Sequence, residues 1–115
     1  MRPWYPVLPI LLLLAAATPA SAFMAYVSNE KSNTVSVIDT DKWVVTKTIK
    51  VGQRPRGIEF TRDGKFVLVA VGDDDKIEII DAASQRVVDS LPSGPDPELF
   101  TQDAAGKFLY VANEN

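Results

Sequence analysis

Residues 57–97 read GIEFTRDGKFVLVAVGDDDKIEIIDAASQRVVDSLPSGPDP, and this stretch decides the fold. Residues 57–61 alternate apolar and polar side chains, which is typical of a half-buried β-strand. Residues 66–71 are apolar at every position, so a strand here has to be covered on both faces. Two further strand patterns follow: residues 76–80 are β-branched and alternating, and residues 86–91 are the most polar. We therefore predict four short strands separated by turns.

The same unit recurs along the chain at a constant offset. Gly64-Lys65-Phe66 returns as Gly106-Lys107-Phe108, 42 positions later, and each glycine falls in a hairpin turn that needs a positive φ. The other matches at this offset pair residues 26–28 with 68–70 and 110–112, Ile38-Asp39 with Ile80-Asp81, Val45 with Val87, Gly52 with Gly94, and Pro55 with Pro97. Four short strands per unit and a period in the low forties are the pattern of a β-propeller blade.

We predict an all-β fold built of propeller blades of four antiparallel strands. The blade repeats are expected at approximately 23–56, 57–97 and 98–115, with the third incomplete. A β-sandwich is the alternative, since it also uses closely spaced strands. It would not repeat turn and core residues together at one fixed offset, so the propeller is favoured.

The N-terminal segment has the pattern of a secretory signal peptide. Arg2 precedes an apolar run at residues 7–17, and the small residues at 18–22 offer a cleavage site before Phe23. The alternative is a membrane anchor, but a spanning helix needs about 20 apolar residues. We expect this signal peptide to direct the protein to the periplasm or the outside of the cell. Residues 1–22 would then be removed, and no membrane anchor would remain.

Composition excludes several classes of function. The chain has no cysteine and no histidine, so disulfides, Cys or His catalysis and the usual zinc and copper sites are absent from it. With 12 basic and 15 acidic residues the formal net charge is −3, which is not the basic surface of a nucleic-acid-binding protein.

Charged residues mark a candidate ligand or partner face. The loops that cross from one blade to the next swap sign at equivalent positions, with Arg54 against Asp96 and Arg56 against Glu98. In a propeller these crossings share one face of the ring with the acidic turn Asp73-Asp74-Asp75. The alternative is that the four charges form inter-blade ion pairs or are solvated, which costs little. A Ca²⁺ site at residues 73–75 is a further alternative, but the EF-hand spacing is missing.

Three other residues have structural interpretations. Asp39 and Asp81 each end a strand and precede a turn, so we expect their carboxylates to accept hydrogen bonds from the turn backbone. Trp43 is expected to cover blade surface on the outer strand. No catalytic, cofactor-binding or metal-binding residue is identified.

The repeat resembles the YVTN-type β-propeller family. The matching motifs are Tyr26-Val27-Ser28-Asn29, Tyr110-Val111-Ala112-Asn113, residues 34–40, residues 52–57 and residues 63–66. Residues 94–100 and 110–115 look like a narrower group, the exported propellers associated with PQQ-dependent catabolism. The resemblance implies a closed ring of seven blades, of which this chain supplies about two. Ring closure would then need the remaining blades or self-association.

The resemblance also implies a function. The protein would be a binding or accessory module without catalysis of its own that serves periplasmic PQQ-dependent alcohol catabolism. Its partners would be a quinoprotein dehydrogenase or a transporter component. PQQ would be involved only indirectly, because Asp89 stands where the quinoprotein dehydrogenase blade motif has a docking Trp. The alternatives are a propeller enzyme of lactonase-like type and an inactive truncated product.

Overall fold

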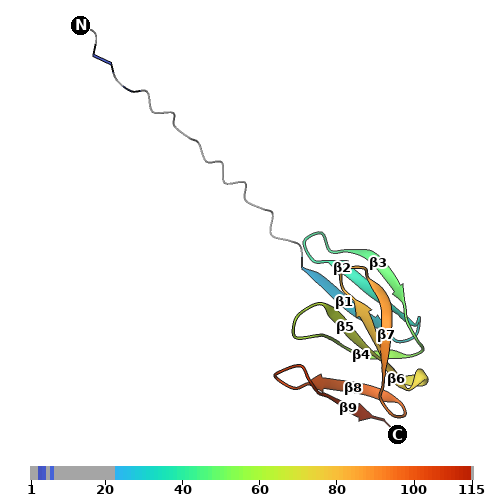
Figure 1. Ribbon diagram of the computed structural model, residues 1–115. Coiled ribbons are helices and arrows are strands. Elements are labelled where there is room, and N and C mark those ends of the chain that lie inside the picture. The colour runs from blue at the N-terminus through green and yellow to red at the C-terminus, as the bar shows by residue number, and fades with distance from the viewer. Residues whose placement is uncertain (1–2, 5, 7–22, 115) are drawn as a thin grey trace.

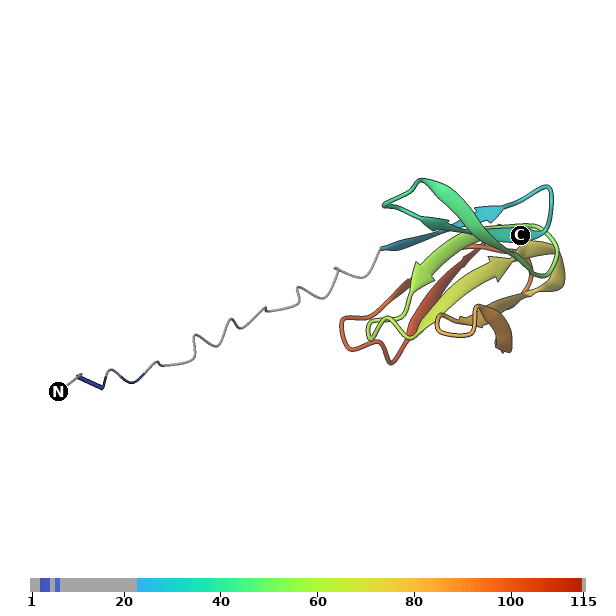
Figure 2. The ribbon, with the colours of Figure 1, turned by 90° about the horizontal axis from the view of Figure 1, so that it is seen from above.

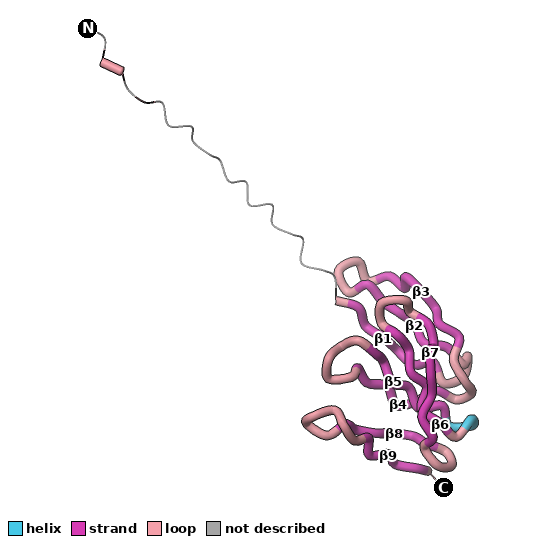
Figure 3. Tube along the Cα trace, viewed as in Figure 1, coloured by secondary structure: helices cyan, strands magenta, loops and turns pink. Residues whose placement is uncertain are grey.

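The computed structural model describes residues 3–4, 6 and 23–114, and within them the chain forms strands, turns and one short helical turn (Figure 3). The predicted signal peptide lies almost entirely outside the described residues. No described helix has the length and apolar character needed to cross a membrane. The elements are β1 (Met24–Asn29), β2 (Thr34–Asp39), β3 (Val44–Lys50), β4 (Pro55–Phe60), β5 (Phe66–Val71), η1 (Gly72–Asp74), β6 (Lys76–Asp81), β7 (Arg86–Pro92), β8 (Pro97–Gln102) and β9 (Leu109–Asn113).

The strands form three antiparallel sheets in chain order: β1-β2-β3, β4-β5-β6-β7 and β8-β9. The four-stranded sheet lies between the other two, with β4 in contact with both β1 and β8 (Figure 1). Neighbouring strands follow one another in sequence, as a meander of hairpins requires. The prediction of an all-β fold made of four-stranded blades is confirmed.

Two apolar cores hold the sheets together, and alternate side chains of β5 contribute to one core and to the other. Val67, Val69 and Val71 point to the β1–β3 sheet and pack there with Val35, Val37 and Ile80 among others. Leu68 and Ala70 point the opposite way and pack with Ile77, Phe100 and Leu109. Because side chains alternate between the two faces of a strand, an uninterrupted apolar run can serve both cores.

Burial falls from the inner strands to the outer one. The last five residues of β5 are buried, whereas every residue of β7 is exposed. The polarity difference between residues 66–71 and 86–91 therefore reflects their distance from the cores. Gly64 and Gly106 have φ of 71° and 69° in their hairpin turns, as the repeat predicted.

The turn residues divide into one confirmed prediction and one wrong one. The carboxylate of Asp39 accepts hydrogen bonds from the N–H groups of Asp41 and Lys42, and that of Asp81 from the N–H of Ser84. Trp43 does not cover blade surface. It sits in the turn before β3 with φ of 55° and is 79% exposed, because its backbone N–H closes the turn onto the carbonyl of Asp39 and this directs the ring to solvent.

Candidate binding face

The crossing loops, the β1–β2 turn and the η1 turn lie at one end of the strands, and the turns β2–β3, β4–β5, β6–β7 and β8–β9 lie at the other (Figure 2). Arg54 and Asp96 occupy equivalent places in the two crossings, and both adopt positive φ, 59° and 46°. Their carbonyl groups accept hydrogen bonds from the N–H groups of Gly72 and Glu114 respectively. The repeat therefore reproduces the loop backbone, and only the side chains differ.

The sign-swapped charges meet as ion pairs between the sheets. Arg56 is the least exposed of them, with a side chain only 12% accessible. Its Nη2 lies 2.8 Å from Asp96 Oδ1, and its Nη1 lies 2.7 Å from Glu114 Oε2 and 3.5 Å from Glu98 Oε1. Arg54 contacts two of the same acids, at 3.5 Å from Asp96 and 2.5 Å from Glu114. We call Arg54, Arg56, Asp96, Glu98 and Glu114 the ion-pair cluster.

The charged groups of the cluster shift one another's pKa values. The hydrogen bond from Arg56 lowers the pKa of Glu114, and the charges of Arg56 and Arg54 act in the same direction. Partial burial opposes the charge of Arg54, but Asp96, Glu114 and Asp73 together raise its pKa. Glu30 and Asp73 also approach Arg54, at 3.6 and 3.3 Å. Five carboxylates therefore lie within ion-pair distance of two guanidinium groups, so this group of side chains carries a net negative charge.

The three aspartates of the predicted acidic turn each have a different partner. Asp73 pairs with Arg54, Asp74 Oδ2 accepts the N–H of Gln53 at 2.7 Å, and Asp75 Oδ1 accepts the N–H of Asp96 at 2.9 Å. Asn33 takes the position of Asp75 in the first repeat and accepts the N–H of Arg54. The carboxylate of Asp75 thus shapes a crossing loop in the same way as the amide of Asn33.

Two acidic residues of this end were missed by the prediction. Glu114 joins the ion-pair cluster, and the 42-residue period could have placed it there, since it is the equivalent of Gly72. Glu78 is buried on β6 and accepts the N–H of Gly52 at 2.8 Å. No local sequence pattern predicts this role of Glu78, because its partner Gly52 lies in the crossing between two sheets.

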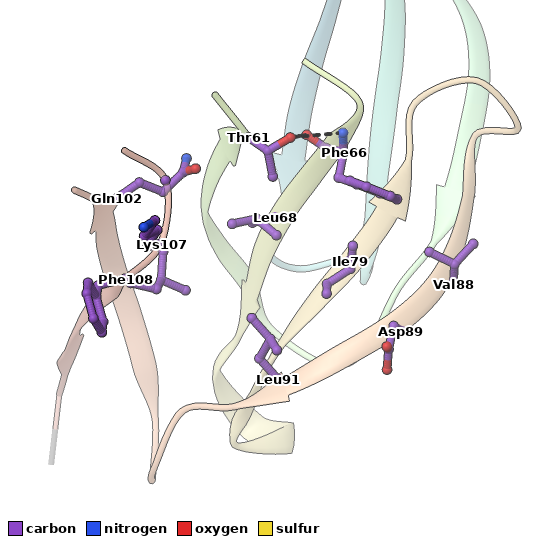
Figure 4. A pocket seen from close by; sticks show the side chains of 12 residues that line it. Thr61, Phe66, Leu68, Ile79, Val88, Asp89, Leu91, Gln102, Lys107 and Phe108 are labelled. Carbon is purple, nitrogen blue, oxygen red and sulfur yellow. Dashed lines mark hydrogen bonds between the residues drawn. The ribbon is translucent and has the colours of Figure 1, made fainter. Parts of the chain in front are cut away.

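In the part of the chain that the structure describes, no three His, Cys, Asp or Glu side chains are grouped so that they could hold a metal ion. A groove of about 410 Å³ lies between the β5–β7 strands and the β8–β9 sheet (Figure 4). Leu68, Ile79 and Leu91 line one side of it and Phe108 and Leu109 the other. It is mainly apolar and lies apart from the ion-pair cluster.

Stacked antiparallel sheets, of which the central one has four strands, together with a regular 42-residue repeat are the pattern of β-propeller blades. The family model described as YNCE-like beta-propeller matches residues 9–112. The chain therefore belongs to the YNCE-like β-propeller family. No curated protein matches it.

Solved structures share the fold. Hydrazine synthase of Kuenenia stuttgartiensis is similar at 24% identity with a TM-score of 0.74, over 78% of this chain and 26% of the other. A functionally unknown protein from Desulfotomaculum acetoxidans is 25% identical with a TM-score of 0.67, over 79% and 31%. The dihydro-heme d1 dehydrogenase NirN, solved with DHE, is 20% identical with a TM-score of 0.68, over 78% and 19%. The matched region is thus less than a third of each of these proteins.

Proposed function

We propose that this chain is part of an exported, non-catalytic β-propeller that binds a protein partner through the end that carries the crossing loops, the η1 turn and the ion-pair cluster, which we call the loop face. The partner class is a periplasmic quinoprotein dehydrogenase or a component of its transport system, so that PQQ stays with the partner. The observation that carries the proposal is the ion-pair cluster, together with Glu30 from the β1–β2 loop: loops and strand ends around all three sheets bring these charged side chains to one end of the molecule.

The chemistry of this face supports protein binding. The side chains of Glu30, Glu98 and Glu114 are 56%, 46% and 46% exposed, so each can contact another molecule while it remains near an arginine. Exposed carboxylates around a fixed guanidinium pair favour a partner with a complementary basic patch. The motif resemblance at residues 94–100 and 110–115 supports the assignment to PQQ-dependent catabolism.

A binding titration against a purified PQQ-dependent alcohol dehydrogenase from the same organism tests the proposal. We expect the double variant Glu30→Gln, Glu98→Gln to bind about 3- to 10-fold more weakly at low ionic strength, with the difference vanishing at high salt. Both glutamates make only long ion pairs, 3.6 and 3.5 Å, so their removal leaves the fold intact.

The matched control is Asp41→Asn, which removes one exposed carboxylate from the opposite end of the strands. Unchanged binding by the control and weaker binding by the double variant support the loop face. Equal binding by all three proteins contradicts the proposed face, and absence of binding by the wild-type chain excludes the dehydrogenase as the partner.

A further inference from the structure

The two crossings between blades have the same backbone and opposite side-chain charges. We call residues 51–56 the first crossing and residues 93–98 the second crossing; each includes the first two residues of the strand that follows. In the first crossing the N–H of Arg54 donates to the side chain of Asn33, and in the second the N–H of Asp96 donates to that of Asp75, the repeat equivalent of Asn33. The loop backbone therefore does not distinguish one crossing from the other.

The cores of the blades are also too similar to identify a neighbour. Residues 26–29 read YVSN and residues 110–113 read YVAN, and Gly64-Lys65-Phe66 returns as Gly106-Lys107-Phe108. Apolar burial is non-directional, and a core accepts side chains of similar volume. The feature that separates the crossings is the sign of their charged side chains.

These charges meet across the two crossings. Arg56 Nη2 lies 2.8 Å from Asp96 Oδ1, and Arg56 Nη1 lies 3.5 Å from Glu98 Oε1. Arg54 Nη2 also approaches Asp96 Oδ1, at 3.5 Å. The side chains of Arg56 and Asp96 are only 12% and 15% exposed, so solvent and salt screen this contact weakly. Two like charges in the same place would therefore repel strongly.

A glycine leaves room for this contact. Gly72 is the repeat equivalent of Glu30 and Glu114. A Cβ at Gly72 would lie 3.0 Å from Asp96 Oδ1 and 3.3 Å from Arg56 Nη2. A glutamate at this position would crowd the ion pair and place a second carboxylate against Asp96. Of the three repeats, the acid is thus missing from the one in which it would obstruct the contact between the crossings.

We infer that the opposite charges of the two crossings fix which blade follows which. The basic crossing accepts the acidic crossing as its neighbour, and two crossings of the same sign reject each other. Two acidic crossings side by side would bring Asp96 and Glu98 against a second pair of carboxylates with no guanidinium between them. Repulsion of the wrong neighbour gives a specificity that attraction between similar cores does not.

The consequence is a correct order in an array of nearly identical units. Multidomain and repeat proteins are prone to misassembly and to exchange of equivalent parts, within a chain or between copies. A charge pattern that only the correct neighbour satisfies opposes both. This role needs no ligand and is independent of the partner binding proposed above.

A disulfide at the far end of the strands reports whether the two blades are neighbours. A Cβ at Gly106 would lie 3.5 Å from the Cβ of Arg62, within the roughly 3.5–4.5 Å that a disulfide spans. The two positions lie in the β8–β9 and β4–β5 turns, opposite to the crossings (Figure 2). Because the natural chain has no cysteine, the variant Arg62→Cys, Gly106→Cys carries only these two thiols. Its equilibrium with a glutathione buffer gives the effective concentration of one thiol at the other.

Three charge patterns are compared with the natural one in the full chain that carries these cysteines. The half-swap Arg54→Asp, Arg56→Glu makes both crossings acidic, and Arg54→Asn, Arg56→Gln is its uncharged control of the same size. The full swap adds Asp96→Arg, Glu98→Arg to the half-swap, which restores the natural charge balance with the signs exchanged. Position 96 accepts arginine because Arg54 adopts a similar positive φ in the first crossing.

We expect the half-swap to lower the effective concentration of the thiols about tenfold below that of the uncharged control at low ionic strength. The full swap should raise it again to within about threefold of the natural pattern, since the paired charges act together. At high salt the difference between the half-swap and its control should shrink.

Three results would overturn the inference. A half-swap equal to its uncharged control would mean that the crossings attract the right neighbour without rejecting the wrong one. A full swap no better than the half-swap would mean that the complementarity of the signs is not what matters. Absence of the disulfide with the natural charge pattern would mean that the two blades are not held as neighbours.

Discussion

At the scale of single residues, Arg56 is the centre of the loop face. Its guanidinium contacts Asp96, Glu98, Glu114 and the carbonyl of Pro97, and so links β4 to β8 and to the residue that follows β9. Its Nε is buried without a hydrogen-bond partner, an unfavourable arrangement that the charged contacts of the other two nitrogens offset. A nearly buried arginine with several acids destabilises the fold strongly when it is removed, since the acids lose their counter-charge.

Replacement of Arg56 by methionine should therefore lower the free energy of unfolding by about 2 kcal/mol, somewhat less than a fully buried pair. Arg54→Met is the matched control, because the Arg54 side chain is 31% exposed against 12% for Arg56 and should matter less. Urea unfolding followed by tryptophan or tyrosine fluorescence measures both. Equal losses in the two variants would show that burial does not set the strength of the cluster.

Turn aspartates make the stability depend on acid pH. Hydrogen bonds from the N–H groups of Phe108 and then Lys107 lower the pKa of Asp103 below its usual 3.8. A carboxyl with a depressed folded-state pKa contributes stability that is complete above its ordinary pKa and is lost as the pH falls through the folded value. The stabilisation from Asp103 should therefore disappear only below pH 3.8.

The variant Asp103→Asn keeps an oxygen acceptor for the turn but does not titrate. Its unfolding free energy should fall less steeply than that of the wild type as the pH drops below the ordinary carboxyl pKa. Denaturant titrations at a series of acid pH values, with Asp41→Asn as the control, measure the difference. Identical slopes in wild type and variant would contradict the assignment.

At the scale of elements, the close approach of β4 to β8 depends on one glycine. A Cβ at Gly57 would lie 2.6 Å from the carbonyl oxygen of Glu98 and 3.2 Å from the Cα of Leu99. Both obstacles are backbone atoms, which a rotamer change cannot move. The absence of a side chain at position 57 therefore sets how closely the two inner strands pack.

The variant Gly57→Ala should separate β4 from β8 and destabilise the chain by about 1–3 kcal/mol, the usual cost of overpacking. Gly64→Asn is the control, because Gly64 has a positive φ but no atom within 4 Å of the position that a Cβ would take, and asparagine tolerates this φ. Urea midpoints measure the cost, and hydrogen exchange of β8 locates it. A Gly57→Ala variant as stable as Gly64→Asn would refute the packing argument.

At the scale of the whole molecule, protection should decrease outward from β5. This strand pairs on both edges and is buried by both cores, whereas β9 pairs only with β8 and carries Tyr110 at 62% exposure. Stability is not uniform within a fold, and segments with one strand partner and few apolar contacts open first.

Amide hydrogen exchange should accordingly be slowest at residues 67–71 and fastest, among the strands, in β9. Mass spectrometry of peptides over a time course gives the order directly. Protection of β9 equal to that of β5 would mean that β9 is held by contacts beyond the β8–β9 pair.

The sequence by itself determined the strands, their order and the turns that join them. Alternation at residues 57–61, the apolar run at 66–71, the positive-φ glycine at 64 and the Asx turn at Asp81 depend on groups a few residues apart. The tandem repeat then identified the blade, because the same local chemistry returned at a fixed interval.

Only the tertiary structure decided which side chains meet. Glu114 contacts Arg54 and Arg56, which precede it by 60 and 58 residues. The carboxylate of Glu78 on β6 accepts the N–H of Gly52, which lies in the crossing between two sheets. The exposure of Trp43 was likewise settled by the backbone of its turn. The physical reason is that contacts between sheets depend on their spacing and relative rotation, which the packing of all three sheets sets together and no local run of residues specifies.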